Sequence, residues 1–122
     1  MTWTLTYHAR PWTTNAERRG NHFQRAVNVR TWREAFWALA HEAKVGRHQR
    51  IKLTVALQLR GRRSMDIDAC APATKAAIDG LVDARVIPDD GHGHIESITI
   101  LEPILGAERD AFTLTIEEVP VA

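Results

Sequence analysis

The sequence predicts a single α+β domain over residues 1–122, built on a mixed sheet. Residues 51–59 alternate apolar and polar side chains, which is the period of a half-buried strand. Residues 31–45 and the segment that begins at Pro72 repeat apolar residues at helical spacing. The predicted elements follow the order β-α-β-α-β-β, which is typical of an α+β domain. The composition, 44% hydrophobic and 25% charged, is that of a folded globular protein.

The N-terminal third contains a predicted strand, a long polar segment and a predicted helix. Thr2–Tyr7 alternates threonine with larger apolar side chains, which predicts a half-buried strand. Residues 11–28 are polar and rich in arginine, so we expect a long loop, and loops of such length are often functional. The helix is expected to begin at Thr31, which would form a capping box with Glu34, and to end at Gly46.

The remaining elements follow the clear central strand. A basic turn over residues 60–64 comes first. Pro72 suits the first turn of a helix, which we expect to run to about Ala84. Two further strands are predicted over residues 94–101 and 112–119, and we expect them to form a hairpin.

Several protein classes are excluded by composition. Cys70 is the only cysteine, so an intrachain disulfide and a cysteine-rich zinc site are both excluded. No run of about 18 apolar residues is present, so we expect no membrane-spanning helix and no membrane partner. The first ten residues lack the basic head and apolar stretch of a signal peptide. We therefore expect a protein of the cytoplasm.

Charge is distributed unevenly along the chain. Residues 1–63 carry 13 Lys and Arg residues and only 3 Asp and Glu residues, whereas residues 64–122 carry 3 and 12. Of the 13 basic residues, 11 are Arg, whose planar guanidinium suits phosphate. This asymmetry favours a polyanion-binding half, and the alternative is that the two halves interleave and neutralise each other at the surface.

Carboxylates gather in the centre of the chain. On an extended chain, side chains at i and i+2 point to one face, so we expect Asp66 and Asp68 to lie together. Like charges about 4 Å apart repel by roughly 4 kcal/mol at an effective dielectric constant of about 20, and a divalent cation would offset this repulsion. The acidic pair at residues 89–90 lies in a later loop. Lys75 would stabilise phosphate charge or pair with Asp79. From spacing alone, a solvated acidic turn remains the alternative.

These segments together resemble the RusA family of Holliday junction resolvases, which are mostly encoded by phages and prophages. Residues 66–68 read Asp-Ile-Asp, residues 75–81 read Lys-Ala-Ala-Ile-Asp-Gly-Leu, and residues 89–90 read Asp-Asp. These three separated elements occur in the family's order, and the match covers residues 62–90. A looser similarity in the N-terminal region involves Pro11, Asn15 and residues 32–34.

The resemblance implies an activity and a set of site residues. RusA enzymes are homodimers that bind four-way DNA junctions and cut them symmetrically with Mg²⁺. Carried over to this sequence, the metal ligands would be Asp66, Asp68 and Asp90, and these three residues with Lys75 would be catalytic. Asp89 would assist, and Mn²⁺ is the alternative ion. A phage-encoded protein would act in the cytoplasm of its bacterial host.

One position departs from the family pattern. The family has Asn directly after Asp-x-Asp, and this chain has Ala69. An Asn there would cap the following helix or hold a neighbouring group, and alanine does neither. The next residue, Cys70, is expected to pack in the core. The departure motivates an alternative reading, in which the protein is a degenerate relative that holds branched DNA without cutting it.

Arginines are expected to hold the DNA backbone. The long basic segment also contains Phe23, which would stack on an unpaired base. An ordinary solvated loop is the alternative interpretation of this segment. The candidate DNA-binding residues are Asn15, Arg18, Arg19, Arg25, Arg60, Arg62 and Arg63.

Three further residues invite weaker hypotheses. His92 and His94 lie beside the acidic pair, so a His/Asp zinc site is conceivable, although exposed histidines in a turn are the favoured interpretation. Trp37 falls off the apolar stripe formed by Trp32 and Phe36 and is a candidate for a dimer interface. A third reading of the whole chain is an interaction protein with paired faces of opposite charge.

Overall fold

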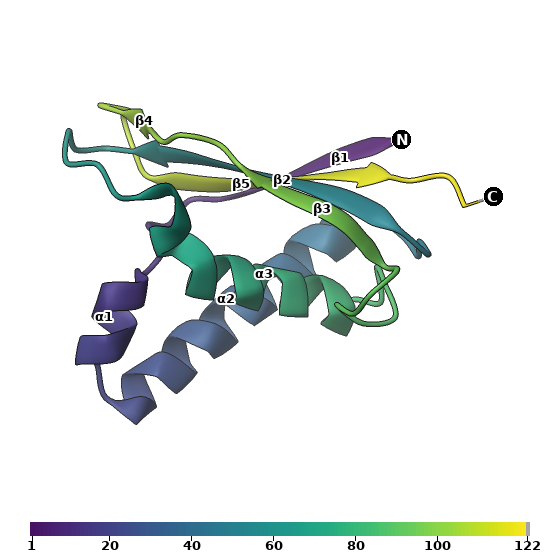
Figure 1. Cartoon of the computed structure of the whole chain (residues 1–122), viewed down its shortest axis with the longest axis horizontal. Helices are drawn as coiled ribbons and strands as arrows, with labels where there is room; N and C mark the ends of the chain where they lie inside the picture. The colour runs from purple at the N-terminus through teal and green to yellow at the C-terminus, as the bar shows by residue number, and fades with distance from the viewer. Residues whose placement is uncertain (122) are drawn as a thin grey trace.

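The protein forms one layer of sheet covered on one face by helices (Figure 1). The α+β class with a mixed sheet is thus confirmed. The computed structural model describes residues 1–121. Its elements are β1 (Thr2–Tyr7), α1 (Thr14–Arg19), α2 (His22–Glu42), β2 (Ile51–Leu59), the 3₁₀ helix η1 (Ile67–Cys70), α3 (Ala71–Asp83), β3 (Ile95–Ile100), β4 (Ile104–Leu105) and β5 (Ala111–Glu118).

The sheet has the order β1-β5-β2-β3, and the short strand β4 pairs with the end of β2. Strand β5 runs antiparallel to both β1 and β2, whereas β3 runs parallel to β2. The predicted hairpin between residues 94–101 and 112–119 is therefore wrong. These two strands lie on opposite sides of β2, because α3 returns the chain for parallel pairing and β5 then crosses to the other edge.

The core lies between the sheet and helices α2 and α3. Strand β2 buries every second residue against the helices, as its alternation predicted. An aromatic cluster joins the layers: the Phe112 ring centroid lies 5.0 Å from that of Trp32 and 5.5 Å from that of Phe36. Such pairs contribute about 0.5–1.5 kcal/mol each beyond the area they bury. None of the described helices is long and apolar enough to cross a membrane.

The segment predicted as a long loop is largely helical, so that prediction is wrong. Thr13 caps α1, its Oγ1 accepting a hydrogen bond from Ala16 N at 3.1 Å, and Asn21 caps α2 by accepting one from Gln24 N at 2.7 Å. Figure 1 shows α1 and the start of α2 as an arm that projects away from the sheet. The arm buries little, so it lacks the apolar period by which a helix is recognised, and only its caps signal it.

Both predicted limits of the central helix are also wrong. Thr31 lies in the interior of α2, which begins nine residues earlier, so it caps nothing. The helix ends before Lys44, which adopts the left-handed conformation with φ 55°, and Gly46 lies beyond this turn. The prediction favoured glycine because glycine adopts this conformation most easily, but here lysine occupies it.

Candidate functional site

The predicted catalytic residues gather around the start of α3. Asp66 directly precedes η1, and Asp68 lies within this 3₁₀ turn. The expected extended backbone over Asp66 to Asp68 is therefore wrong, and the argument that alternation puts both carboxylates on one face fails at Asp68. Both residues are exposed. Ala69 lies inside η1, so an Asn there would not occupy the capping position of α3, which is held by Cys70.

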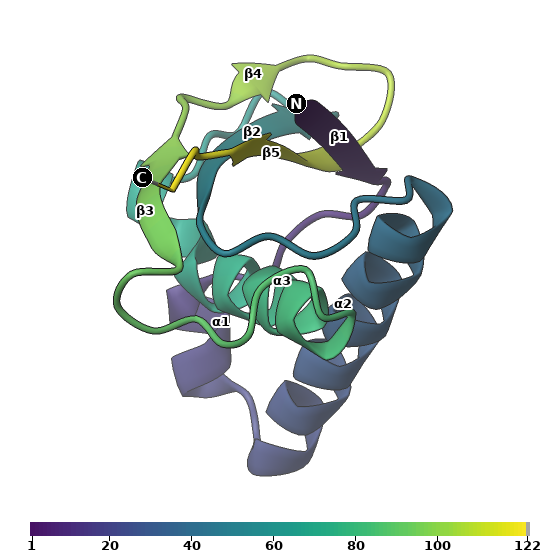
Figure 2. The same ribbon diagram turned by 90° about the vertical axis from the view of Figure 1, so that its right-hand side faces the viewer.

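Lys75 bridges two carboxylates. Its Nζ donates to Asp79 Oδ1 at 3.0 Å and to Asp90 Oδ2. Figure 2 shows the loop between α3 and β3 running back alongside α3, which brings Asp90 to a lysine 15 residues earlier. The expected pair with Asp79 is thus confirmed. Because the Lys75 side chain is 59% exposed, these pairs add little stability, and they orient the ammonium group.

Asp89 shapes the loop that carries Asp90. Its Oδ1 accepts a hydrogen bond from Gly91 N at 2.6 Å, which closes a tight turn. Its Oδ2 lies 3.9 Å from His94 Nε2, and the other ring nitrogen of His94 lies 2.8 Å from Gln49 O. Asp89 and His94 therefore tie the loop to the rest of the fold.

The donor types suit Mg²⁺, but the side chains do not form a ready-made site. Carboxylate oxygens are the ligands that Mg²⁺ prefers, and Asp66, Asp68 and Asp90 all reach solvent. Within residues 1–121, however, no three His, Cys, Asp or Glu side chains converge closely enough to hold a metal ion. This also leaves His92 and His94 without the third ligand that a zinc site needs. An ion could be held only if the carboxylates moved together and Lys75 released Asp90.

An arginine-rich cleft lies beside Asp66. It has a volume of about 390 Å³ and brings together three guanidinium groups and Asp66, from four segments that are separate in the sequence. Asn15, Arg19 and Arg63 were predicted to bind DNA, and the structure brings them together here. Its lining residues are Arg10, Thr13, Asn15, Arg19, Arg63, Ser64, Met65, Asp66 and Ala69.

Arg10 and Thr13 are functional candidates that sequence reasoning missed. Arg10 directly follows the first strand, and only this position gave a signal. Trp12 holds this part of the cleft in place, because its ring centroid lies 5.8 Å from that of Trp32 and its Nε1 donates to Glu17 Oε2 at 2.9 Å. Helix α1 is thereby anchored to the aromatic core.

The other predicted DNA-binding residues lie around this cleft rather than in it. Arg60 lies in the turn after β2, where its backbone N–H donates to Asp110 Oδ1 at 2.8 Å. The guanidinium group of Arg62 lies beside Gly106. Arg18 is exposed on α1. The structure thus places the basic turn and α1 on two sides of Asp66.

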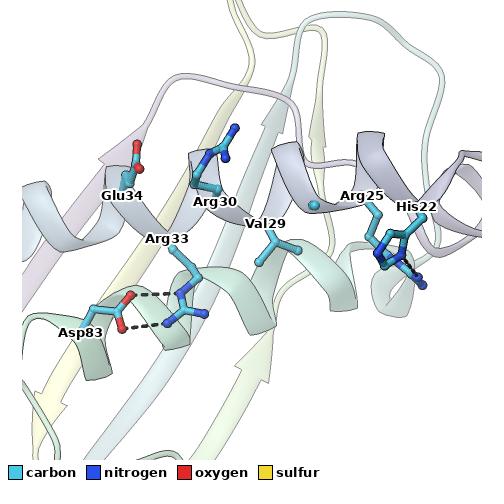
Figure 3. Close-up of a pocket in the computed structure, with 8 residues that line it drawn as sticks. His22, Arg25, Val29, Arg30, Arg33, Glu34 and Asp83 are labelled. Atoms are coloured by element: carbon cyan, nitrogen blue, oxygen red, sulfur yellow. Dashed lines mark hydrogen bonds and ion pairs between the residues drawn. The ribbon is translucent and has the colours of Figure 1, made fainter.

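Arg25 belongs to a second groove, along the first half of α2 (Figure 3). One of its terminal nitrogens lies 3.2 Å from His22 Nδ1. Further along the groove, Arg33 makes a bidentate contact with Asp83 at 2.8 and 3.0 Å, and this hydrogen bonding raises the pKa of the Arg33 guanidinium. Arg33 therefore ties α2 to α3, and Arg25 and Arg30 remain exposed.

The two oppositely charged halves of the chain interleave in part. Asp83 neutralises Arg33, and Glu96 lies 3.7 Å from Arg50 and 3.8 Å from Lys52. Within the described residues 1–121, the arginines of the cleft beside Asp66 form no such ion pair. The unneutralised positive charge is thus concentrated where the acidic residues of the candidate site begin.

Two further expectations concern buried and exposed residues. Cys70 is buried, as expected, and burial raises the pKa of its thiol, so it packs in the core as a neutral group. Trp37 is 47% exposed, and its ring centroid lies 4.5 Å from that of His41. No protein-family model matches the chain, and no curated protein matches its sequence.

Proposed function

We propose that the protein is a structure-selective endonuclease of RusA type, which binds four-way DNA junctions and cuts them by paired phosphodiester hydrolysis. The observation that carries this proposal is the cleft in which Arg10, Arg19 and Arg63 adjoin Asp66. Guanidinium groups bind phosphate through charge-assisted hydrogen bonds. A DNA backbone held there would lie against the Asp-x-Asp segment at the start of α3.

The proposed chemistry requires Mg²⁺, with Mn²⁺ as the alternative. Asp66, Asp68 and Asp90 would hold the ion, which when bound polarises the scissile phosphate and activates a water molecule. Lys75 is already oriented by Asp79 and Asp90. Once Asp90 turns to another partner, Asp79 keeps the ammonium group at the site, where it can stabilise the negative charge that develops on the phosphate.

The remaining parts of the proposal follow from the same resemblance. We propose a homodimer, because two-fold symmetry would present two sites to the two strands cut in a junction. The exposed Trp37 is the candidate for its interface. We place the protein in the cytoplasm, that of a bacterial host if it is encoded by a phage.

A second candidate function is binding of branched DNA without cleavage. Two observations favour it: Ala69 replaces the Asn of the family motif, and no three carboxylates converge within residues 1–121. The arginine cleft would serve this function equally well. The two candidates differ in whether Mg²⁺ produces cut strands.

The test uses a labelled four-way junction and a linear duplex of matched sequence, each with Mg²⁺ or with EDTA. We expect paired nicks in the junction only, and only with Mg²⁺. The Asp68→Asn variant should lose cleavage by a factor of at least about 100 and keep junction binding, because it removes a metal ligand but not an arginine. Glu117→Gln, an exposed carboxylate on β5, is the matched control and should cut normally.

Each outcome of this assay has a distinct meaning. A junction that is bound but never cut would move the function to the binding candidate. Normal cleavage by Asp68→Asn would overturn the site assignment while leaving the activity in place. A protein that neither binds nor cuts the junction would overturn both candidates.

A further inference from the structure

The two long helices end in the same unusual way. Lys44 follows the last residues of α2 with φ 55°, and Arg85 follows those of α3 with φ 62°. In each turn the hydrogen bonds are those of a Schellman motif: Lys44 N donates to His41 O at 3.1 Å and Val45 N to Ala40 O at 3.1 Å. The turn after α3 repeats both bonds at 2.9 Å.

Glycine is the usual residue at this position, because a side chain makes the left-handed conformation unfavourable. Among residues 1–121, Lys44 and Arg85 are the only residues other than glycine with positive φ. Both are long cations. A conformation that costs stability at two sites, each time with a positively charged side chain, points to a use for the charge.

Both cations line one hollow. Lys44, Arg47 and Arg85 surround a surface depression of about 430 Å³, and Arg47 and Arg85 also line an adjoining depression of about 330 Å³. No carboxylate lines either depression. All three cations are exposed, and none forms an ion pair within residues 1–121. The hollow is therefore a concentrated positive surface.

This positive surface is separate from the cleft beside Asp66. The cleft includes Ala69 just before α3, whereas the hollow includes Ala84 just after it. The 13 residues of α3 span about 20 Å. That length corresponds to about six base pairs of duplex DNA. One chain thus carries two positive surfaces at the two ends of the same helix.

We propose that Lys44, Arg47 and Arg85 hold the phosphate backbone of duplex DNA away from the site of cleavage. This proposal rests on the proposed DNA-binding function. Duplex DNA fits better than a small phosphate, because the hollow lies at helix C-termini, whose partial negative charge repels a small anion held close to the backbone. A polyanion instead meets the tips of three exposed side chains and releases counterions along its length.

The test measures DNA binding without cleavage. Fluorescence anisotropy with a labelled junction and a labelled duplex is recorded in EDTA, from about 50 to about 200 mM salt. The triple variant Lys44→Gly, Arg47→Gln, Arg85→Gly removes the three charges, and glycine suits the two left-handed positions, so its Tm should equal or exceed that of the natural protein. Lys52→Gln is the control, because β2 directs Lys52 away from the buried face of the sheet.

We expect the triple variant to bind both DNAs at least about tenfold more weakly at the lowest salt and to reduce the salt slope by roughly three. Lys52→Gln should leave both quantities unchanged. Wild-type affinity and slope in the triple variant would overturn the proposal, while loss of binding in Arg19→Gln, Arg63→Gln would show that the proposed DNA-binding function stands without it. Absence of DNA binding by the natural protein would overturn both.

Discussion

At the scale of single residues, the segment that carries the family resemblance has mixed roles. Lys75 and Asp79 form an exposed ion pair beside the candidate site. Gly80 and Leu81 instead belong to the packing of α3, since both are buried. A Cβ atom on Gly80 would lie 2.6 Å from the carbonyl oxygen of Arg33 and 2.9 Å from Cβ of Phe36. The glycine of the motif thus lets two helices cross closely.

Gly80→Ala should therefore destabilise the protein. Alanine favours a helix by up to about 1 kcal/mol over glycine, but the clash with α2 forces the helices apart, and overpacking costs about 1–3 kcal/mol. We expect a lower Tm and a lower urea midpoint, with the free energy of unfolding reduced by about 1–2 kcal/mol. Gly61→Ala is the control, because its Cβ would meet only Arg63 N, at 3.9 Å. Equal effects of the two substitutions would contradict this account.

At the scale of elements, the helix ends differ from what composition suggests. Gly46 was expected to terminate the helix, yet Lys44 takes the left-handed position two residues earlier. The bonds that close the turn come from the backbone, so any residue able to tolerate the conformation can serve there. Val45 and Val86, the residues that follow, are 2% and 1% exposed, and their burial holds the two turns in place.

Arg85→Gly should stabilise the protein. Glycine removes the steric cost of positive φ, and the expected gain in the free energy of unfolding is about 0.5–1 kcal/mol, after allowing for the larger entropy of the unfolded glycine. Chemical denaturation should show a higher midpoint with an unchanged slope. Arg47→Gly removes the same charge at a residue without positive φ. If it stabilised the protein equally, the charge rather than the backbone would be the cause.

At the scale of the whole molecule, one aromatic cluster joins the sheet to the helices. Phe112 of β5 is fully buried and packs edge-to-face on Trp32 and Phe36 of α2. Tyr7 of β1 adds a further edge contact, with its ring centroid 5.0 Å from that of Trp32. Sheet and helix are thus parts of one packing unit.

Phe112→Ala should reduce the free energy of unfolding by about 3–5 kcal/mol through loss of burial and creation of a cavity. Because the cluster spans both layers, helix circular dichroism and tryptophan fluorescence should still report one coincident transition. Phe23→Ala, at a side chain that is 76% exposed, should change stability by no more than about 0.5 kcal/mol. Separate transitions in the two signals would show that sheet and helices unfold independently.

The sequence by itself determined the elements whose residues alternate between core and solvent. The strand over residues 51–59 and the helix that starts near Pro72 were predicted within a residue or two, because burial on one face imposes a period on the chain. The arm over residues 14–30 shows the limit of this signal. It is helical but largely exposed, so no apolar period marks it, and its caps at Thr13 and Asn21 were the only local sign.

Only the tertiary structure decided which strands are neighbours and which charges meet. The last two long strands lie on opposite sides of β2, although adjacency in sequence favoured a hairpin. Arg33 is neutralised by Asp83, 50 residues away, whereas Arg19 and Arg63 meet at the cleft beside Asp66. Lys75 reaches Asp90 only because the loop after α3 folds back. Periodicity records the environment of each residue, but a contact between distant residues depends on how whole elements pack, and no local pattern encodes that.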